Sequence, residues 1–176
     1  MSRLGLILAG GASSRMGRNK ALLELDGERL IDRAIRRLGP QVEAVAVSAA
    51  AIPGLGVPQL ADETAGEGPL SGILAGLAFA GREGFASMLT LAVDTPFFPD
   101  DLSARLPPSH FVARHYTCAH WPVSAEAEVR LRLANGERKL APLLGALGFV
   151  PVAFSEEAFF NINTPEDFAQ AARRLA

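Results

Sequence analysis

Residues 4–20 read LGLILAGGASSRMGRNK, and this stretch decides the fold. Its first part, Leu4 to Ala9, is a continuous apolar run, which is typical of a strand buried on both faces of a parallel sheet. Two glycines end the run, and a loop rich in glycine and basic residues follows it. Ligands of open α/β sheets bind beyond the carboxyl ends of the strands, so this loop lies where a ligand is expected.

The rest of the chain alternates between apolar runs and segments with helical spacing. Further strands are predicted over residues 42–47, 57–61, 86–93 and 149–154, with a short antiparallel or mixed strand within 107–122. Helices are predicted over residues 30–38, 69–81, 100–106, 126–133 and 139–147, and from Pro165 onward behind an N-cap at Thr164. This alternation predicts an α/β fold with a mostly parallel sheet and helices on both faces. A length of 176 residues favours a single domain over residues 1–176.

Composition excludes several classes of function. Seventeen Lys and Arg residues stand against nineteen Asp and Glu residues, so no strong positive charge is available for nucleic acid or an anionic membrane. The only cysteine, Cys118, cannot form an internal disulfide or a zinc site built on several thiolates, and a packed small hydrophobic role is expected for it. The first apolar run is too short to be a membrane span. We therefore expect a cytoplasmic protein with no nucleic acid or membrane as partner.

The glycine-rich loop carries the features of a phosphate site. Its glycines allow tight turns and bring backbone N–H groups close to phosphate oxygens, while Arg15, Arg18 and Lys20 add charged donors. The loop is not a P-loop, because Arg18 follows Gly17 where that motif has Lys and Ser or Thr, and it is not the dinucleotide-binding pattern. The alternative is a surface turn with solvated basic residues.

Two polar features lie beyond the ends of other predicted elements. Asp94 follows the buried strand over 86–93 and could bind Mg²⁺, which takes oxygen ligands, or could simply cap the turn before Pro96. Asn161 and Asn163 alternate with Ile162, which places both amides on one face of an extended segment. They could orient a ligand or serve as turn formers.

Residues 8–20 follow the pattern LAGGxSxRMGxxK, which resembles the opening signature of small nucleotidyltransferases and most closely that of the molybdenum cofactor guanylyltransferases. The resemblance continues through Asp62, GPLSG at 68–72, VDTPF at 93–97 and FNINTPED at 160–167, and so spans the chain. It implies a three-layer, Rossmann-like nucleotidyltransferase fold. It also implies that GMP is transferred from GTP to the terminal phosphate of the molybdopterin cofactor, with Mg²⁺ as cofactor and release of pyrophosphate.

The same resemblance implies a role for each matching residue. The catalytic residues would be Arg15, Lys20 and Asp94, with Asp94 as the metal ligand. The GTP-binding residues would be Leu8, Ala9, Gly10, Gly11, Lys20, Ser48, Asp62, Gly68, Pro69, Leu70 and Asp94. The molybdopterin side would comprise Asn161, Asn163, Arg138 and Lys139.

Several of these residues could instead have a purely structural role. Asp62 could be a turn residue, and Arg138 and Lys139 could be an exposed charged helix start. The segment His120–Trp121 resembles the family's H-P segment and would line the pterin side, whereas the three histidines of the chain are otherwise expected to be solvated or locally hydrogen-bonded. The chain departs from the family at Ser48, where an asparagine often helps to hold the nucleoside.

Other functions remain open at this point. An enzyme could instead transfer CMP to the same pterin, or transfer a nucleotide to a sugar or lipid phosphate. Gly10, where the cytidylyltransferases often have alanine, and the pair Asn161 and Asn163 argue against these readings. A non-enzymatic nucleotide or cofactor carrier is argued against by Asp94 and Lys20. Beyond its substrates, the protein could serve client molybdoenzymes or cofactor chaperones.

Overall fold

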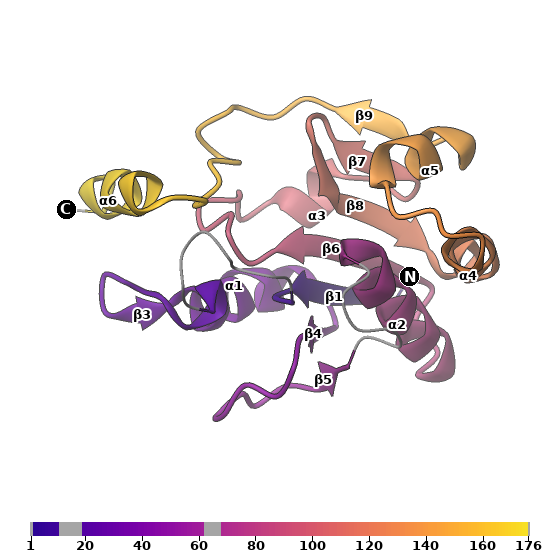
Figure 1. Ribbon diagram of the computed structural model, residues 1–176, viewed down its shortest axis with the longest axis horizontal. Coiled ribbons are helices and arrows are strands. Elements are labelled where there is room, and N and C mark those ends of the chain that lie inside the picture. The colour runs from indigo at the N-terminus through magenta and orange to yellow at the C-terminus, as the bar shows by residue number, and fades with distance from the viewer. Residues whose placement is uncertain (1, 11–18, 62–67, 176) are drawn as a thin grey trace.

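The computed structural model describes residues 2–10, 19–61 and 68–175. In this part of the chain a seven-stranded sheet has the order β5–β4–β1–β6–β8–β7–β9, which Figure 1 shows from the bottom of the view to the top. Its strands are β1 (Arg3–Leu8), β4 (Ala44–Ser48), β5 (Gln59–Leu60), β6 (Ser87–Ala92), β7 (His110–Val112), β8 (His115–Pro122) and β9 (Val150–Val152). Strand β8 is antiparallel to both of its neighbours, and the other pairs in this sheet are parallel. The mostly parallel α/β sheet predicted from the sequence is confirmed.

Helices cover both faces of this sheet. The helices are α1 (Leu30–Leu38), α2 (Pro69–Arg82), α3 (Leu102–Arg105), α4 (Glu126–Ala134), α5 (Leu140–Ala146) and α6 (Pro165–Arg173). Side chains alternate along β1, so Ile7 packs in the core under α1 and α3 whereas Leu4, Leu6 and Leu8 pack in the core under α2, α4 and α5. In Figure 1, α2, α4 and α5 lie on one side of the sheet, and α1 and α6 lie on the other. The arrangement has three layers, as the sequence predicts.

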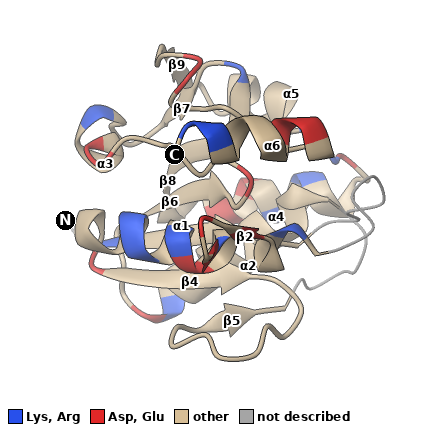
Figure 2. Cartoon of the chain, turned by 90° about the vertical axis from the view of Figure 1, so that its left-hand side faces the viewer, with Lys and Arg blue, Asp and Glu red and all other residues tan. Residues whose placement is uncertain are grey.

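Two helices show how the sequence fixes this packing. Helix α1 is amphipathic, with Leu30 and Ile31 buried, and its arginines lie along the face seen in Figure 2, where Glu28 pairs with Arg33 and Arg36. Helix α2 approaches β1 closely, because a Cβ atom at Gly76 would overlap Leu6 and Met88. The glycine lets the helix lie against the central strands.

The region that gave the poorest sequence signal contains two strands. Instead of one short strand within 107–122, the structure has β7 and the eight-residue β8, which pair in an antiparallel ladder. The register shifts between Phe111 and Val112, and Ser109 and Arg114 have positive φ values, so a simple alternation of polar and apolar residues is lost.

Several short elements were not predicted. They are the 3₁₀ helices η1 (Lys20–Leu22), η2 (Gly39–Gln41) and η3 (Val123–Ala125), and a hairpin of β2 (Glu24–Leu25) and β3 (Glu28–Arg29). The hairpin turn, Asp26–Gly27, has φ values of 54° and 74°, which is the conformation that Asp-Gly favours in two-residue hairpin loops. Among the described residues, no helix combines the length and the apolar character needed to cross a bilayer.

Candidate functional site

Asp94 lies at the carboxyl end of the central strand β6. Its carboxylate accepts a hydrogen bond from Lys20 Nζ at 3.2 Å through Oδ2 and from Asn161 Nδ2 at 3.2 Å through Oδ1. The turn that follows is held instead by the Thr95 hydroxyl, which donates to the Ala92 carbonyl at 2.7 Å. The Asp94 side chain is 17% exposed. Its described contacts therefore favour a functional role over the alternative of a turn cap.

Lys20 follows the glycine-rich loop, and its side chain contacts the segment Asn161–Asn163 near the C-terminal end. It begins η1, which is capped by the side chain of Asn19 accepting from the Ala21 amide at 3.1 Å. Its ammonium group donates to Asp94 and, at 2.8 Å, to Asn163 Oδ1. This ammonium has three protons, so one remains for a ligand oxygen while both protein contacts are kept.

The Asn161–Asn163 segment is anchored by the helix that follows it. Thr164 and Asp167 form a capping box at the start of α6, and Asp167 Oδ2 also accepts from the Asn163 amide at 2.9 Å. The backbone hydrogen bond from Asn163 holds the pKa of Asp167 below its usual value. On the other side, the Ile162 amide donates to the Asp94 carbonyl at 2.9 Å. The asparagine side chains thus face Asp94 and Lys20 rather than closing a turn.

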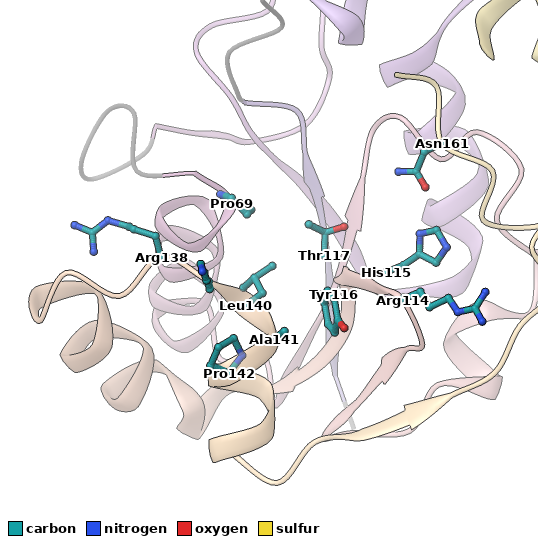
Figure 3. Close-up of a pocket in the computed structure, with 11 residues that line it drawn as sticks. Pro69, Arg114, His115, Tyr116, Thr117, Arg138, Leu140, Ala141, Pro142 and Asn161 are labelled. Atoms are coloured by element: carbon teal, nitrogen blue, oxygen red, sulfur yellow. The ribbon is translucent and has the colours of Figure 1, made fainter. Parts of the chain in front are cut away.

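A pocket of about 500 Å³ opens beside Asn161 (Figure 3). It is lined by Pro69 at the start of α2, by residues 114–117 at the start of β8, by residues 138–142 and by Asn161. Three of the four residues predicted for the molybdopterin side, Asn161, Arg138 and Lys139, are in this lining. The fourth, Asn163, lies beside Lys20 instead.

The two basic residues of the pocket differ in their contacts. Arg138 donates through Nη1 to the carbonyls of Leu133 and Glu137, at 2.8 and 3.0 Å, and so caps the end of α4. Figure 3 shows its guanidinium group directed away from Tyr116 and Asn161. Lys139 is exposed, and among the described residues it has no hydrogen-bond or ion-pair partner. Lys139 is therefore the better placed of the two to meet a bound anion.

His115 is a residue of this site that the sequence analysis missed. It lines the pocket from the start of β8, beside Asn161, and contacts Phe159, with 5.3 Å between the ring centroids. Burial lowers the pKa of His115, although the nearby Asp94 carboxylate opposes this shift. Its location follows from the antiparallel direction of β8, which brings the start of this strand to the edge where β6 ends.

The segment His120–Trp121 does not line the pterin side, and that prediction is wrong. Both residues are fully buried and pair with the first half of β6, far along the strand from Asp94. His120 hydrogen-bonds with the Leu106 carbonyl at 2.8 Å and with Ser87 Oγ at 2.9 Å. Trp121 Nε1 donates to the Thr90 hydroxyl at 3.1 Å. Both side chains hold the core together at the opposite end of the sheet.

Cys118 is also a core residue. It is buried, and burial raises the pKa of its thiol well above the ordinary value. The thiolate needed for nucleophilic attack is therefore disfavoured, which confirms the expected role as a packed small side chain.

The residues predicted for the nucleotide are described only in part. Gly11, Arg15 and Asp62 lie outside the described residues. The amides of Ala9 and Gly10 both donate to the Ser48 carbonyl, at 2.9 and 3.0 Å. These two amides are therefore already engaged within the protein.

Five of these nucleotide-side residues are at strand ends or at the start of α2. Leu8 and Leu70 are buried, so their backbone is the part that could face a ligand. Ser48 is 2% exposed and supports the start of the loop through its carbonyl. Gly68 has φ +74°, a conformation that L side chains rarely adopt, and it allows the chain to enter α2 at Pro69.

The donor set at this edge suits a magnesium ion shared with a substrate. Among the described residues, no group of three or more His, Cys, Asp and Glu side chains gathers as a metal cage would require. Asp94 is a single carboxylate, and the hydrogen bonds from Lys20 and Asn161 use two of its roughly four lone-pair sites. Mg²⁺ commonly takes one or two carboxylates, several waters and substrate phosphates, and this fits Asp94.

The sheet order and the helices on both faces are those of the α/β nucleotidyltransferase fold. A solved structure described as a nucleotidyl transferase from Methanothermobacter thermautotrophicus matches with a TM-score of 0.80 over 98% of this chain and 97% of its own, at 19% identity. At this identity the match establishes the fold.

Closer relatives establish the family. Two proteins described as molybdenum cofactor guanylyltransferase, from Rhodobacter capsulatus and Cereibacter sphaeroides, are 46% and 43% identical over 97% and 99% of this chain. The matches cover 95% and 98% of those two proteins. The family model for the MobA-like NTP transferase domain matches residues 5–149. The chain belongs to the MobA-like NTP transferase family, which confirms the resemblance identified from the sequence.

Proposed function

We propose that this enzyme transfers GMP from GTP to the terminal phosphate of the molybdopterin cofactor and releases pyrophosphate. The family and the names of its full-length relatives support this reaction and do not favour cytidylyl transfer or a carrier role. One observation carries the proposal. Lys20, which follows the nucleotide loop, contacts both Asp94 and Asn163, so the nucleotide and acceptor segments meet at a single point.

The chemistry requires positioning more than acid–base catalysis. A phosphate monoester is largely dianionic near neutral pH, so its oxygen can attack the α-phosphorus of GTP without a general base. A bond forms from that oxygen to the α-phosphorus, the bond from the α-phosphorus to the bridging oxygen breaks, and pyrophosphate leaves with the electron pair. The protein has to align the two phosphates and neutralise their charge.

The residues at the carboxyl edge divide this work. Lys20 would direct its third proton to a phosphate oxygen, and Arg15 would add a second cation to the triphosphate. Asp94 would hold Mg²⁺, which would neutralise charge on the triphosphate oxygens. The backbone from Gly10 to Gly11 would approach the nucleotide.

Further residues would hold the two ends of the substrates. Residues 66–71 and Ser48 would lie near the nucleoside, with Asp62 contacting the nucleotide. Asn161, Asn163, Arg138 and Lys139 would lie on the molybdopterin side and orient the acceptor. These assignments follow the family pattern residue by residue.

The test is a comparison of nucleotides with one acceptor. The purified protein is incubated with Mg²⁺, molybdopterin and equal concentrations of GTP, CTP or ATP, and the dinucleotide product and pyrophosphate are measured. GTP should be the preferred donor. Turnover with CTP at a rate equal to or above that with GTP would contradict guanylyl transfer, and the absence of any dinucleotide product would contradict the reaction as a whole.

We further propose that the protein works in the cytoplasm, which the buried, unpaired Cys118 suits. Client molybdoenzymes or cofactor chaperones would then receive the product. Pull-down of the purified protein with each candidate client, with and without molybdopterin, would test that step.

A further inference from the structure

The pocket beside Asn161 contains an exposed aromatic side chain that the fold does not require. Tyr116 is the only tyrosine of the chain, is 41% exposed and lines the pocket next to Thr117. Among the described residues its hydroxyl group has no hydrogen-bond partner. A large aromatic side chain in a concave site, with neither core burial nor a polar contact, is a feature typical of ligand binding.

The ring of Tyr116 is held by a stacking contact within the protein. Its ring stacks on that of Phe111, with 5.6 Å between the centroids and 27° between the planes. Phe111 itself packs against the core under α2, α4 and α5. The Tyr116 ring is therefore held in place before any ligand arrives, which reduces the entropy lost on binding.

The opposite wall of the pocket is apolar. Leu140, Ala141 and Pro142 at the start of α5 lie across from Tyr116 and Thr117 in Figure 3. A space with an aromatic ring on one wall and aliphatic side chains on the other can hold a flat ring between the two walls. The exposed ammonium of Lys139 and the amide of Asn161 add polar groups to the lining.

We propose that Tyr116 stacks on the flat pyrimidinone ring of the acceptor's pterin and so selects an acceptor that carries such a ring. This inference rests on the proposed function, because it assigns the acceptor rather than GTP to this pocket. With the ring beside Tyr116, the phosphate arm extends past Asn161 toward Asp94 and Lys20, where the transfer takes place. Tyr116 contributes to acceptor affinity and takes no part in the chemical step.

The test compares Tyr116→Phe, which keeps the ring, with Tyr116→Leu, which removes it. Stacking of a heteroaromatic ring on an aromatic side chain contributes enough that its loss weakens binding roughly tenfold. Tyr116→Leu should raise the KM for molybdopterin about tenfold, equivalent to about 1.4 kcal/mol, and leave kcat and the KM for GTP unchanged. Tyr116→Phe should stay within about twofold of the unmodified protein.

A second measurement separates this inference from the proposed function. Equilibrium dialysis with pterin-6-carboxylate measures ring binding without turnover, and Tyr116→Leu should weaken it about tenfold while Tyr116→Phe does not. Leu131→Ala, which alters an exposed side chain on α4 outside this pocket, is the matched control and should change neither affinity. If Tyr116→Leu fails to fold, Tyr116→Gln takes its place with the same expectation.

The outcomes are distinct. Unchanged affinity for pterin-6-carboxylate and unchanged KM for molybdopterin in Tyr116→Leu would overturn the role of Tyr116 and leave guanylyl transfer intact. Loss of GTP affinity with normal pterin affinity would show that the ring holds the guanine base, which also overturns it. If the unmodified protein makes no dinucleotide but Tyr116→Leu weakens pterin binding, the proposed reaction is contradicted and stacking on Tyr116 is supported.

Discussion

Asn161 donates a hydrogen bond from its side-chain amide to the carboxylate of Asp94, with 3.2 Å between Nδ2 and Oδ1, although 67 positions separate the two residues in the sequence. The backbone repeats this link, because the Ile162 amide donates to the Asp94 carbonyl at 2.9 Å. The residue proposed to hold the metal and the segment proposed to hold the acceptor are therefore joined by two hydrogen bonds. A shift of either one moves the other.

We expect Asp94→Asn to reduce transfer by more than about tenfold, the effect of roughly 1.4 kcal/mol on the barrier. The substitution removes the negative charge that would hold Mg²⁺ and sets an amide against Lys20, while the volume of the side chain is kept. Rates measured over a Mg²⁺ titration test this, and thermal unfolding of the variant serves as the control for folding. A rate and a magnesium dependence like those of the unmodified protein would refute the metal role.

We expect Lys20→Ala to lower kcat more than Arg15→Ala does. Lys20 is tied to Asp94 and Asn163, so its charge is fixed where charge builds on the phosphates in the transition state. Steady-state kinetics with GTP separate a fall in kcat from a rise in KM, which would signal lost uniform binding. Unchanged kcat and kcat/KM in Lys20→Ala would mean that this lysine contributes neither to nucleotide binding nor to the chemical step.

Replacement of both Asn161 and Asn163 by alanine should impair molybdopterin binding or transfer while GTP affinity stays within a few-fold of its normal value. Each hydrogen bond to a charged group is worth about 1.5–3 kcal/mol, so the loss of several gives a large effect. Titration calorimetry with GTP and kinetics with molybdopterin measure the two halves separately.

Asn135→Ala, at the exposed C-cap of α4, is the matched control for this double variant. Loss of GTP affinity with normal molybdopterin affinity would reverse the assignment of the two segments. An unfolded double variant would show that the asparagines serve the structure.

The elements with strong local signals could be predicted from the sequence. Helix α1 has the bounds 30–38 that its spacing predicts, and β1 and β6 agree within one residue at each end, because a buried apolar run and an amphipathic period are both properties of the local sequence. The pairing of β7 with β8 was missed, because a register shift after Phe111 disturbs the alternation. Pairing of this kind depends on distant residues.

The candidate site divides in the same way. Asp94, Lys20, Asn161 and Asn163 were identified from motifs at strand ends, and the structure places them in contact. His115 could not be identified in this way, because its position at the ligand edge depends on the direction of β8. The same strand direction places His120 toward the opposite edge of the sheet. The prediction that its segment lines the pterin side, which rested on a resemblance to a family motif, was therefore wrong.

The stability of the protein should depend on pH through His120. Burial lowers the pKa of His120 to about 4, below the value of about 6.5 for an exposed histidine, and the nearby Arg3 acts in the same direction. Between these two values the unfolded chain binds the proton and the folded protein does not, so stability rises with pH. The contribution is fully present above about pH 6.5 and is lost as the pH falls toward about 4, with a slope of up to about 1.4 kcal/mol per pH unit.

Urea denaturation at about pH 7, 6 and 5 measures this slope. His120→Gln keeps a side chain that can hydrogen-bond with Ser87 and removes the titrating group, so its stability should fall less steeply over the same range. His115, whose pKa burial also lowers, still titrates in this variant, and some slope should therefore remain. Equal slopes in His120→Gln and the unmodified protein would show that His120 is not the source of the dependence.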